Sequence, residues 1–166
     1  MPNPAIPREE VHRFSEECSD MGMDFQSVAS RLLKPQNRLK SFMEKNFSKI
    51  DPVAGQVATY MLSVCIRVFE KKGGRLKKVN RDDLLAAQKS VNQAVSGILP
   101  LDEDFHSRAK ELDSRIQEHL LDEILWALYE REDQKEEEQV LDAKQSAMIY
   151  IMLWTCVEAL DAKWTP

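Results

Sequence analysis

The sequence predicts an all-α protein, a compact bundle of about six helices around two strongly apolar central helices. Apolar residues recur at spacings of three and four over most of the chain, which is the periodicity of a helix. No stretch shows a sustained alternation of apolar and polar residues, and the chain has only five glycines for tight turns. A length of 166 residues corresponds to one ordinary domain. We therefore expect residues 1–6, which are rich in proline, to be a flexible N-terminal tail and residues 7–166 to form a single helical domain.

The first central helix begins at Asp51-Pro52, a capping residue followed by proline at the first helical position. Residues 53–69 are apolar on almost every side, and Gly73-Gly74 ends the helix. Its polar residues form one thin stripe, which either lines an interior pocket or is the single face that reaches solvent: Gln56, Thr59, Ser63, Arg67 and Glu70. The second central helix spans about residues 142–163. We expect these two helices to form the core together.

Amphipathic helices are expected to cover this core. Their predicted ranges are 7–20, 24–33 with Asp24 as its cap, 39–50 after a break at Pro35, 80–98 with Asn80 as its cap, and one long helix from Asp102 to about Tyr129. On the outer face of the long helix, Glu111 and Arg115 are spaced to form an ion pair.

The composition excludes several classes of protein. With 43% hydrophobic and 31% charged residues the chain is globular rather than disordered. The start, MPNPAIP, has neither the basic flank nor the apolar stretch of a signal peptide, and the most apolar run, residues 147–157, is shorter than the roughly 20 residues of a membrane span. The three cysteines form no CxxC pair, so we expect buried, reduced thiols. These features predict a cytoplasmic protein with no membrane contact and no cofactor.

Two Glu-x-x-His motifs, Glu9/His12 and Glu103/His106, are the candidate metal ligands. An i, i+3 spacing puts both side chains on one helix face, and dinuclear iron or manganese bundles use two such motifs with one further glutamate from each of two other helices. Glu70 and Glu158 are available for those two places. Against this, both motifs fall in a predicted first helical turn, where glutamate is favoured by the helix dipole alone. The third histidine, His119, is spaced to pair with Glu123 on a helix surface.

A basic segment at residues 71–81 is the candidate anion site. It holds six cations and no acid: Lys71, Lys72, Arg75, Lys77, Lys78 and Arg81. Residues 1–83 carry 15 basic and 11 acidic side chains, whereas the whole chain has a net charge of −5. Such a segment can bind phosphate or nucleic acid, but it contains no aromatic residue that would stack on bases, and the acidic chain argues against nucleic acid.

No spacing of serine, cysteine and histidine indicates a catalytic nucleophile with its base, and no glycine-rich phosphate-binding motif is present. The segment 130–138 is acidic, with six acids and two bases. The basic N-terminal half and this acidic segment could meet across subunits or orient a partner. We therefore expect a non-enzymatic protein-interaction or assembly module that binds a protein partner or self-associates, for example as a homodimer. A di-metal carboxylate enzyme and a phosphate- or nucleic-acid-binding protein remain the alternatives.

Overall fold

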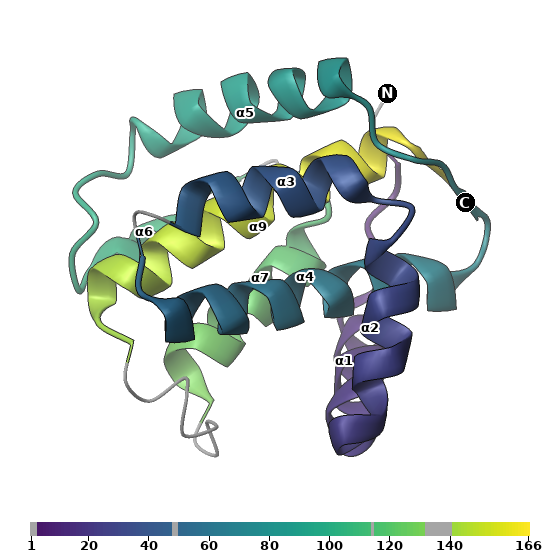
Figure 1. Cartoon of the computed structure of the whole chain (residues 1–166). Coiled ribbons are helices and arrows are strands. Elements are labelled where there is room, and N and C mark those ends of the chain that lie inside the picture. Colours follow the sequence, from purple (N-terminus) through teal and green to yellow (C-terminus); the bar gives the residue numbers. More distant parts are fainter. Residues whose placement is uncertain (1–2, 48–49, 114, 132–140) are drawn as a thin grey trace.

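The computed structural model describes residues 3–47, 50–113, 115–131 and 141–166. The fold is all-α: 73% of the chain is helical, and the described residues form eight α-helices and one two-stranded sheet (Figure 1). The α-helices are α1 (Arg8–Asp20), α2 (Phe25–Leu33), α3 (Asn37–Asn46), α4 (Pro52–Lys72), α5 (Arg81–Val95), α6 (Phe105–Lys110), α7 (Glu118–Leu125) and α9 (Ala143–Ala162). The shorter elements are the 3-10 turn η1 (Gly22–Asp24), the π-helical turn η3 (Trp126–Glu130), and the strands β1 (Arg75–Leu76) and β2 (Trp164–Thr165).

The two predicted central helices are confirmed as α4 and α9, which pack against each other (Figure 1). The side chain of Asp51 caps α4 by accepting a hydrogen bond of 2.8 Å from the backbone N–H of Ala54, and Pro52 occupies the first turn. The side chain of Asp142 caps α9 in the same way, at 2.7 Å from the N–H of Gln145. Both helices are buried over most of their circumference, as their apolar sequences predict.

Among the described residues, α4 is the one helix long and apolar enough to cross a membrane by length and composition. Its most apolar window has a mean hydropathy of 1.3, and 67% of that window is buried inside the protein. This burial is what the core helix of a soluble protein requires, so the apolar character of α4 is accounted for by the fold.

The amphipathic helices lie around this pair. α1, α2 and α3 pack on α4, α5 lies along α9, and α7 contacts both α1 and α9. α3 and α5 run in the same direction, and α9 crosses behind α3 in this view (Figure 1). The side chain of Asn80 caps α5 in a capping box with Asp83, as the sequence predicts. By contrast, Asp24 makes no side-chain cap for α2, because its backbone belongs to η1.

The predicted long helix over residues 102–129 is wrong. The chain forms α6, leaves helical geometry after Lys110, and resumes as α7 and η3. The predicted Glu111–Arg115 pair does not form among the described contacts, because Arg115 is buried. Its guanidinium binds Asp122 at 2.6 Å and the hydroxyl of Tyr150 at 3.2 Å. This interior network holds the chain in a turn where the apolar periodicity alone would continue a helix.

The sequence shows no strand pattern, yet β1 and β2 form a small antiparallel sheet. Leu76 pairs with Trp164, and the indole of Trp164 donates a hydrogen bond of 2.9 Å to the carbonyl of Gly73. Two-residue strands are too short to show any alternation, so periodicity could not reveal them. The sheet attaches the segment after α4 to the C-terminal end of the chain.

Residues 3–6, expected to belong to a flexible tail, make specific contacts. The side-chain amide of Asn3 donates to the carbonyls of Asp161 and Trp164, at 2.9 and 2.8 Å. Ile6 is buried, and its N–H donates to the side chain of Gln117 at 3.0 Å. The prolines of this segment hold it extended, which lets it lie across the ends of α7 and α9.

Candidate functional site

A groove of about 720 Å³ lies between α3 and the first half of α5. We call it the basic groove. One wall comes from α3, the other from α5 and the three residues before it. Its lining residues are Asn37, Arg38, Ser41, Phe42, Lys45, Lys78, Val79, Asn80, Arg81, Leu84, Leu85 and Gln88. The lining is partly apolar, and half of the side chain of Leu85 is exposed there.

Four cations line the basic groove, and no carboxylate does within the part of the chain that the structure describes. They are Arg38 and Lys45 from α3, Lys78 from the loop before α5, and Arg81 from its first turn. None of the four has an ion pair with another described residue, whereas Arg8, Arg31, Arg67, Lys71, Lys72, Arg108, Lys110, Arg115 and Lys163 each bind a carboxylate. The groove therefore gathers positive charge that the fold leaves uncompensated.

A buried glutamine holds the two walls of the basic groove together. Gln36 precedes α3 and is 3% exposed. Its amide nitrogen donates to the carbonyl of Lys77 at 3.2 Å, and its amide oxygen accepts from the N–H of Val79 at 3.0 Å. These two bonds fix the backbone on both sides of Lys78. The loop is tied again where the N–H of Lys77 donates to the carbonyl of Lys163 at 2.9 Å.

Asp83, an acid two residues after Arg81, is already engaged. The carboxylate of Asp83 accepts a hydrogen bond of 3.0 Å from the N–H of Asn80 and lies 3.3 Å from the ammonium of Lys163. Asp83 thus completes the cap of α5 and does not line the basic groove. A ligand in the groove would meet the cations without competition from this carboxylate.

The predicted anion segment 71–81 does not form one site. Lys71 lies 3.6 Å from Glu17 and Lys72 lies 3.0 Å from Glu10, so acids of α1 compensate these two lysines. Arg75 lies in β1, and neither Arg75 nor Lys77 lines the basic groove. Only Lys78 and Arg81 of the six predicted residues do, and they are joined there by Arg38 and Lys45 from α3.

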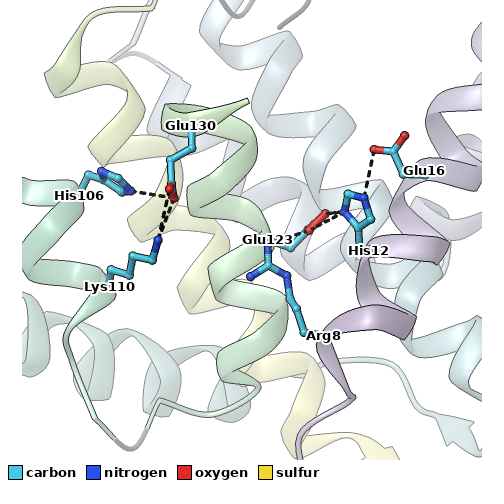
Figure 2. A network of polar contacts seen from close by, with 7 residues as sticks. All are labelled: Arg8, His12, Glu16, His106, Lys110, Glu123 and Glu130. Carbon is cyan, nitrogen blue, oxygen red and sulfur yellow. Dashed lines mark hydrogen bonds and ion pairs between the residues drawn. The ribbon is translucent and has the colours of Figure 1, made fainter. Parts of the chain in front are cut away.

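The two Glu-x-x-His motifs do not share a site. Figure 2 shows His12 on α1 and His106 on α6, on opposite sides of the helix formed by α7 and η3. Glu9 and Glu103 are both exposed, and neither has a described contact with its own histidine. Among the described residues no group of three or more histidine, cysteine, aspartate or glutamate side chains is arranged to hold a metal ion. The convergence that a dinuclear metal site requires is therefore not seen among the described residues.

Each histidine instead binds a glutamate of the α7–η3 helix. Nδ1 of His12 lies 2.6 Å from Glu123, whose carboxylate also binds Arg8 at 3.2 Å (Figure 2). The side chain of Glu123 is 5% exposed, so it is not the surface partner of His119 that its spacing predicts. The two basic partners compensate the charge of this buried carboxylate, and the contacts attach α1 to α7.

The second cluster attaches α6 to η3. Nε2 of His106 lies 3.1 Å from Glu130, and the ammonium of Lys110 lies 3.2 Å from the same carboxylate (Figure 2). The ring of His106 also stacks on Tyr129, with centroids 4.7 Å apart. Although desolvation disfavours the charged form of Glu130, the hydrogen bonds and charges of His106 and Lys110 outweigh it and lower its pKa. Both histidines are thus accounted for by contacts between helices.

The other two residues nominated for a metal site also have separate surroundings. Glu70 binds Arg31 at 2.9 Å and also the guanidinium of Arg67, which lies three residues earlier on α4. Glu158 lies half-buried on α9, where burial raises its pKa.

A second, uncharged hollow continues from the basic groove. It has a volume of about 240 Å³, and we call it the amide compartment. Its lining residues are Phe42, Asn46, Gln88, Asn92, Met148, Ile151, Met152 and Thr155. Phe42 and Gln88 line both spaces, so the basic groove and the amide compartment follow one another along α3 and α5, with α9 as the floor of the second.

A larger cleft of about 1050 Å³ lies elsewhere, between α2 and the first half of α4. The polar stripe of α4 contributes Gln56, Thr59 and Ser63 to its lining. The hydroxyls of Thr59 and Ser63 donate to carbonyls of their own helix, at 2.9 and 3.0 Å. The other lining side chains are mostly apolar, and this cleft has no charged residue among those that the structure describes.

The chain has no match among protein-family models, curated proteins or solved structures. Sequence reasoning found Lys78 and Arg81 but missed the contribution of α3, because the two walls are about 40 residues apart in the chain. The acidic segment 130–138 lies mostly outside the described residues.

Proposed function

We propose that this protein is a non-catalytic binding protein that recognises an acidic segment of a protein partner in the basic groove. The observation that carries the proposal is the set of four cations without described ion pairs that line one groove: Arg38, Lys45, Lys78 and Arg81. Leaving like charges close together costs free energy in the isolated protein. The carboxylates of an acidic ligand would form ion pairs with these cations and so relieve their mutual repulsion.

The chemistry of the groove favours a peptide over nucleic acid. Of its apolar lining residues, Phe42 is partly exposed and Leu85 is half exposed, and these two can pack against aliphatic or aromatic side chains of a partner. Phe42 is the one aromatic residue in the lining, whereas single-stranded nucleic acids are typically bound by several aromatic platforms. The net charge of −5 would also repel a polyanion as large as a nucleic acid at a distance.

The three cysteines support a reducing compartment. Cys18, Cys65 and Cys156 are all free and buried, as is usual for proteins of the cytoplasm. We therefore propose that the protein binds its partner in the cytoplasm.

Fluorescence anisotropy with a labelled acidic peptide tests the proposal. The probe is a ten-residue peptide that contains three glutamates and one leucine. The test variant is the K45E/R81E double variant, and the matched control is K40E/K89E, which reverses the charge of two exposed lysines on the same helices outside the groove. We expect binding to wild type that weakens with added salt, at least tenfold weaker binding to K45E/R81E, and little change for K40E/K89E.

Equal loss in both double variants would mean that only net charge matters, and it would overturn the proposal. A labelled single-stranded oligonucleotide that binds more tightly than the peptide would do the same, in favour of nucleic acid. Light scattering of the wild type identifies a second copy of the chain as the partner if it finds a dimer that K45E/R81E dissociates.

A further inference from the structure

The amide compartment extends the basic groove with a surface of different chemistry. No charged side chain lines it among the described residues, and its floor carries two methionines of α9, Met148 and Met152. Methionine is flexible and polarisable, so such a floor adapts to the shape of an apolar side chain. A segment that lies along both spaces meets cations first and an uncharged, apolar surface second.

Two polar side chains of the amide compartment are satisfied within the protein. The amide nitrogen of Asn46 donates to the carbonyl of Phe42 at 2.8 Å, and the hydroxyl of Thr155 donates to the carbonyl of Ile151 at 3.0 Å. The side-chain amides of Gln88 and Asn92 differ, because neither has a hydrogen bond to another described residue. Each offers a donor and an acceptor, which is the pair that a peptide group requires.

The spacing of these two amides matches an extended peptide. Gln88 and Asn92 are four residues apart on α5, a rise of about 6 Å along the helix. Two residues of extended chain span roughly 6.6 Å. The two amides can therefore bind every second peptide group of an extended segment that runs along α5. From Arg81 to Asn92 the distance along the helix is about 16 Å, the length of roughly five extended residues.

We propose that the basic groove and the amide compartment together recognise a short extended segment that carries acidic residues at one end and a single apolar anchor at the other. The acidic side chains bind at Arg38, Lys78 and Arg81. The backbone is held by Gln88 and Asn92, and the anchor lies between Phe42 and the methionines of α9. This inference rests on the proposed function and specifies the partner that the same site would take.

The test uses three labelled peptides and the full chain. The first peptide has three glutamates, a two-residue spacer and a leucine; the second has serine in place of the leucine; the third has the first sequence reversed, so that both chain directions are sampled. The protein variants are N92A and M148W, the second of which fills the compartment. The matched control is Q93A, at an exposed position beside Asn92 that does not line the compartment. Circular dichroism and a thermal melt establish that each variant is folded.

We expect the better of the two leucine peptides to bind wild type at least tenfold more tightly than the serine peptide. N92A should weaken leucine-peptide binding about fivefold and M148W tenfold or more, while Q93A leaves it unchanged. M148W should not alter the binding of the serine peptide, which separates the anchor from the charges. This inference is overturned if the leucine and serine peptides bind wild type equally. In that case the proposed function is still tested by K45E/R81E. The proposed function is overturned only if the acidic peptides do not bind wild type, or if they bind K45E/R81E as tightly as wild type.

Discussion

At the scale of single residues, two buried glutamines hold segments that have no regular secondary structure. Gln36 binds the loop before α5, and Gln117 binds the N-terminal segment. The amide nitrogen of Gln117 donates to Asp161 at 2.9 Å and to the carbonyl of Pro4 at 3.1 Å. An amide suits this role because it offers a donor and an acceptor without a charge, so it can be buried once its partners are present.

The Q36L variant tests whether Gln36 positions the basic groove. Leucine of similar volume would leave the carbonyl of Lys77 and the N–H of Val79 without partners in the interior, and we expect a loss of about 2 kcal/mol in the free energy of unfolding. Because the loop also carries Lys78, acidic-peptide binding should weaken several-fold. Urea unfolding and peptide anisotropy measure the two effects.

Q117L is the control for this variant. Q117L also removes buried hydrogen bonds of a side-chain amide, but Gln117 is distant in sequence from the residues that line the groove. It should therefore lower the free energy of unfolding without weakening the peptide complex. If Q36L and Q117L weaken binding equally, then the effect is one of general stability and Gln36 has no positioning role.

Glu70 gives a prediction on pH. The hydrogen bond from Arg31, opposed by partial burial and assisted by Arg67, lowers the pKa of Glu70 from 4.5 to about 2. A carboxylate with a lowered folded-state pKa stabilises the fold fully above pH 4.5, and that stabilisation is lost as the pH falls toward 2. Since about a third of the side chain is exposed, we expect E70Q to cost no more than about 1 kcal/mol at pH 7.

Urea unfolding of wild type and E70Q at pH 7 and at pH 3 measures the change. The stability difference between the two proteins should be smaller at pH 3. If the difference in free energy of unfolding between wild type and E70Q is the same at both pH values, then the ion pairs of Glu70 with Arg31 and Arg67 are not its cause.

At the scale of elements, the β1–β2 sheet depends on two glycines that end α4. Gly73 and Gly74 have φ values of +100° and +77°, which side chains rarely adopt. They differ in their surroundings. A Cβ on Gly73 would meet no atom within 4 Å, whereas a Cβ on Gly74 would collide with the carbonyl oxygen of Thr165 and lie 2.7 Å from Cα of Pro166.

The variants G73A and G74A separate backbone strain from collision. We expect G73A to cost about 1–2 kcal/mol for its φ alone. G74A should cost more, because the strand pairing with β2 must open to admit the methyl group. That opening would release Trp164, which packs on Phe69 with ring centroids 5.2 Å apart. Urea unfolding followed by tryptophan fluorescence checks both values. Equal destabilisation by the two substitutions would contradict the close approach at Gly74.

The elements that the sequence predicts correctly are those with local signals. The caps Asp51, Asn80 and Asp142 bind backbone groups within three residues, so their helices begin where the sequence indicates. The break between α6 and α7 has no local signal. Arg115 enters the interior because Asp122 and Tyr150 are placed to bind it. Gln117 has a φ of +55°, and its side chain is held by Ile6, Pro4 and Asp161. Such tertiary contacts override a helical periodicity.

At the scale of the whole molecule, the distribution of ion pairs decides which basic residues remain available. The sequence shows a basic segment, but only the packing of α1 against α4 brings Glu10 and Glu17 to Lys72 and Lys71. The packing of α3 near α5 likewise brings Arg38 beside the loop of Lys78. The sequence therefore shows which residues are basic, and the fold determines which of these residues form ion pairs with acidic side chains.

The three thiols report on the cooperativity of the whole fold, since they lie on α1, α4 and α9. Burial raises the pKa of Cys18 to about 11 and that of Cys65 to about 12, and it raises the pKa of Cys156 as well. The reactive thiolate is therefore scarce at pH 8, and each sulfur is also shielded from reagents in solution. Labelling requires the fold to open.

We predict that pulsed alkylation at pH 8 in rising urea modifies Cys65 and Cys156 together, at the midpoint of global unfolding. Both lie in the α4–α9 core, which opens as one unit if the two helices are mutually dependent. Cys18 should be modified at lower urea, because α1 lies outside this pair and Cys18 borders the cleft beside α2. Mass spectrometry of digested protein assigns the sites, and fully unfolded protein gives the reference rate. Modification of Cys156 without urea at that reference rate would show that α9 is not held in the core.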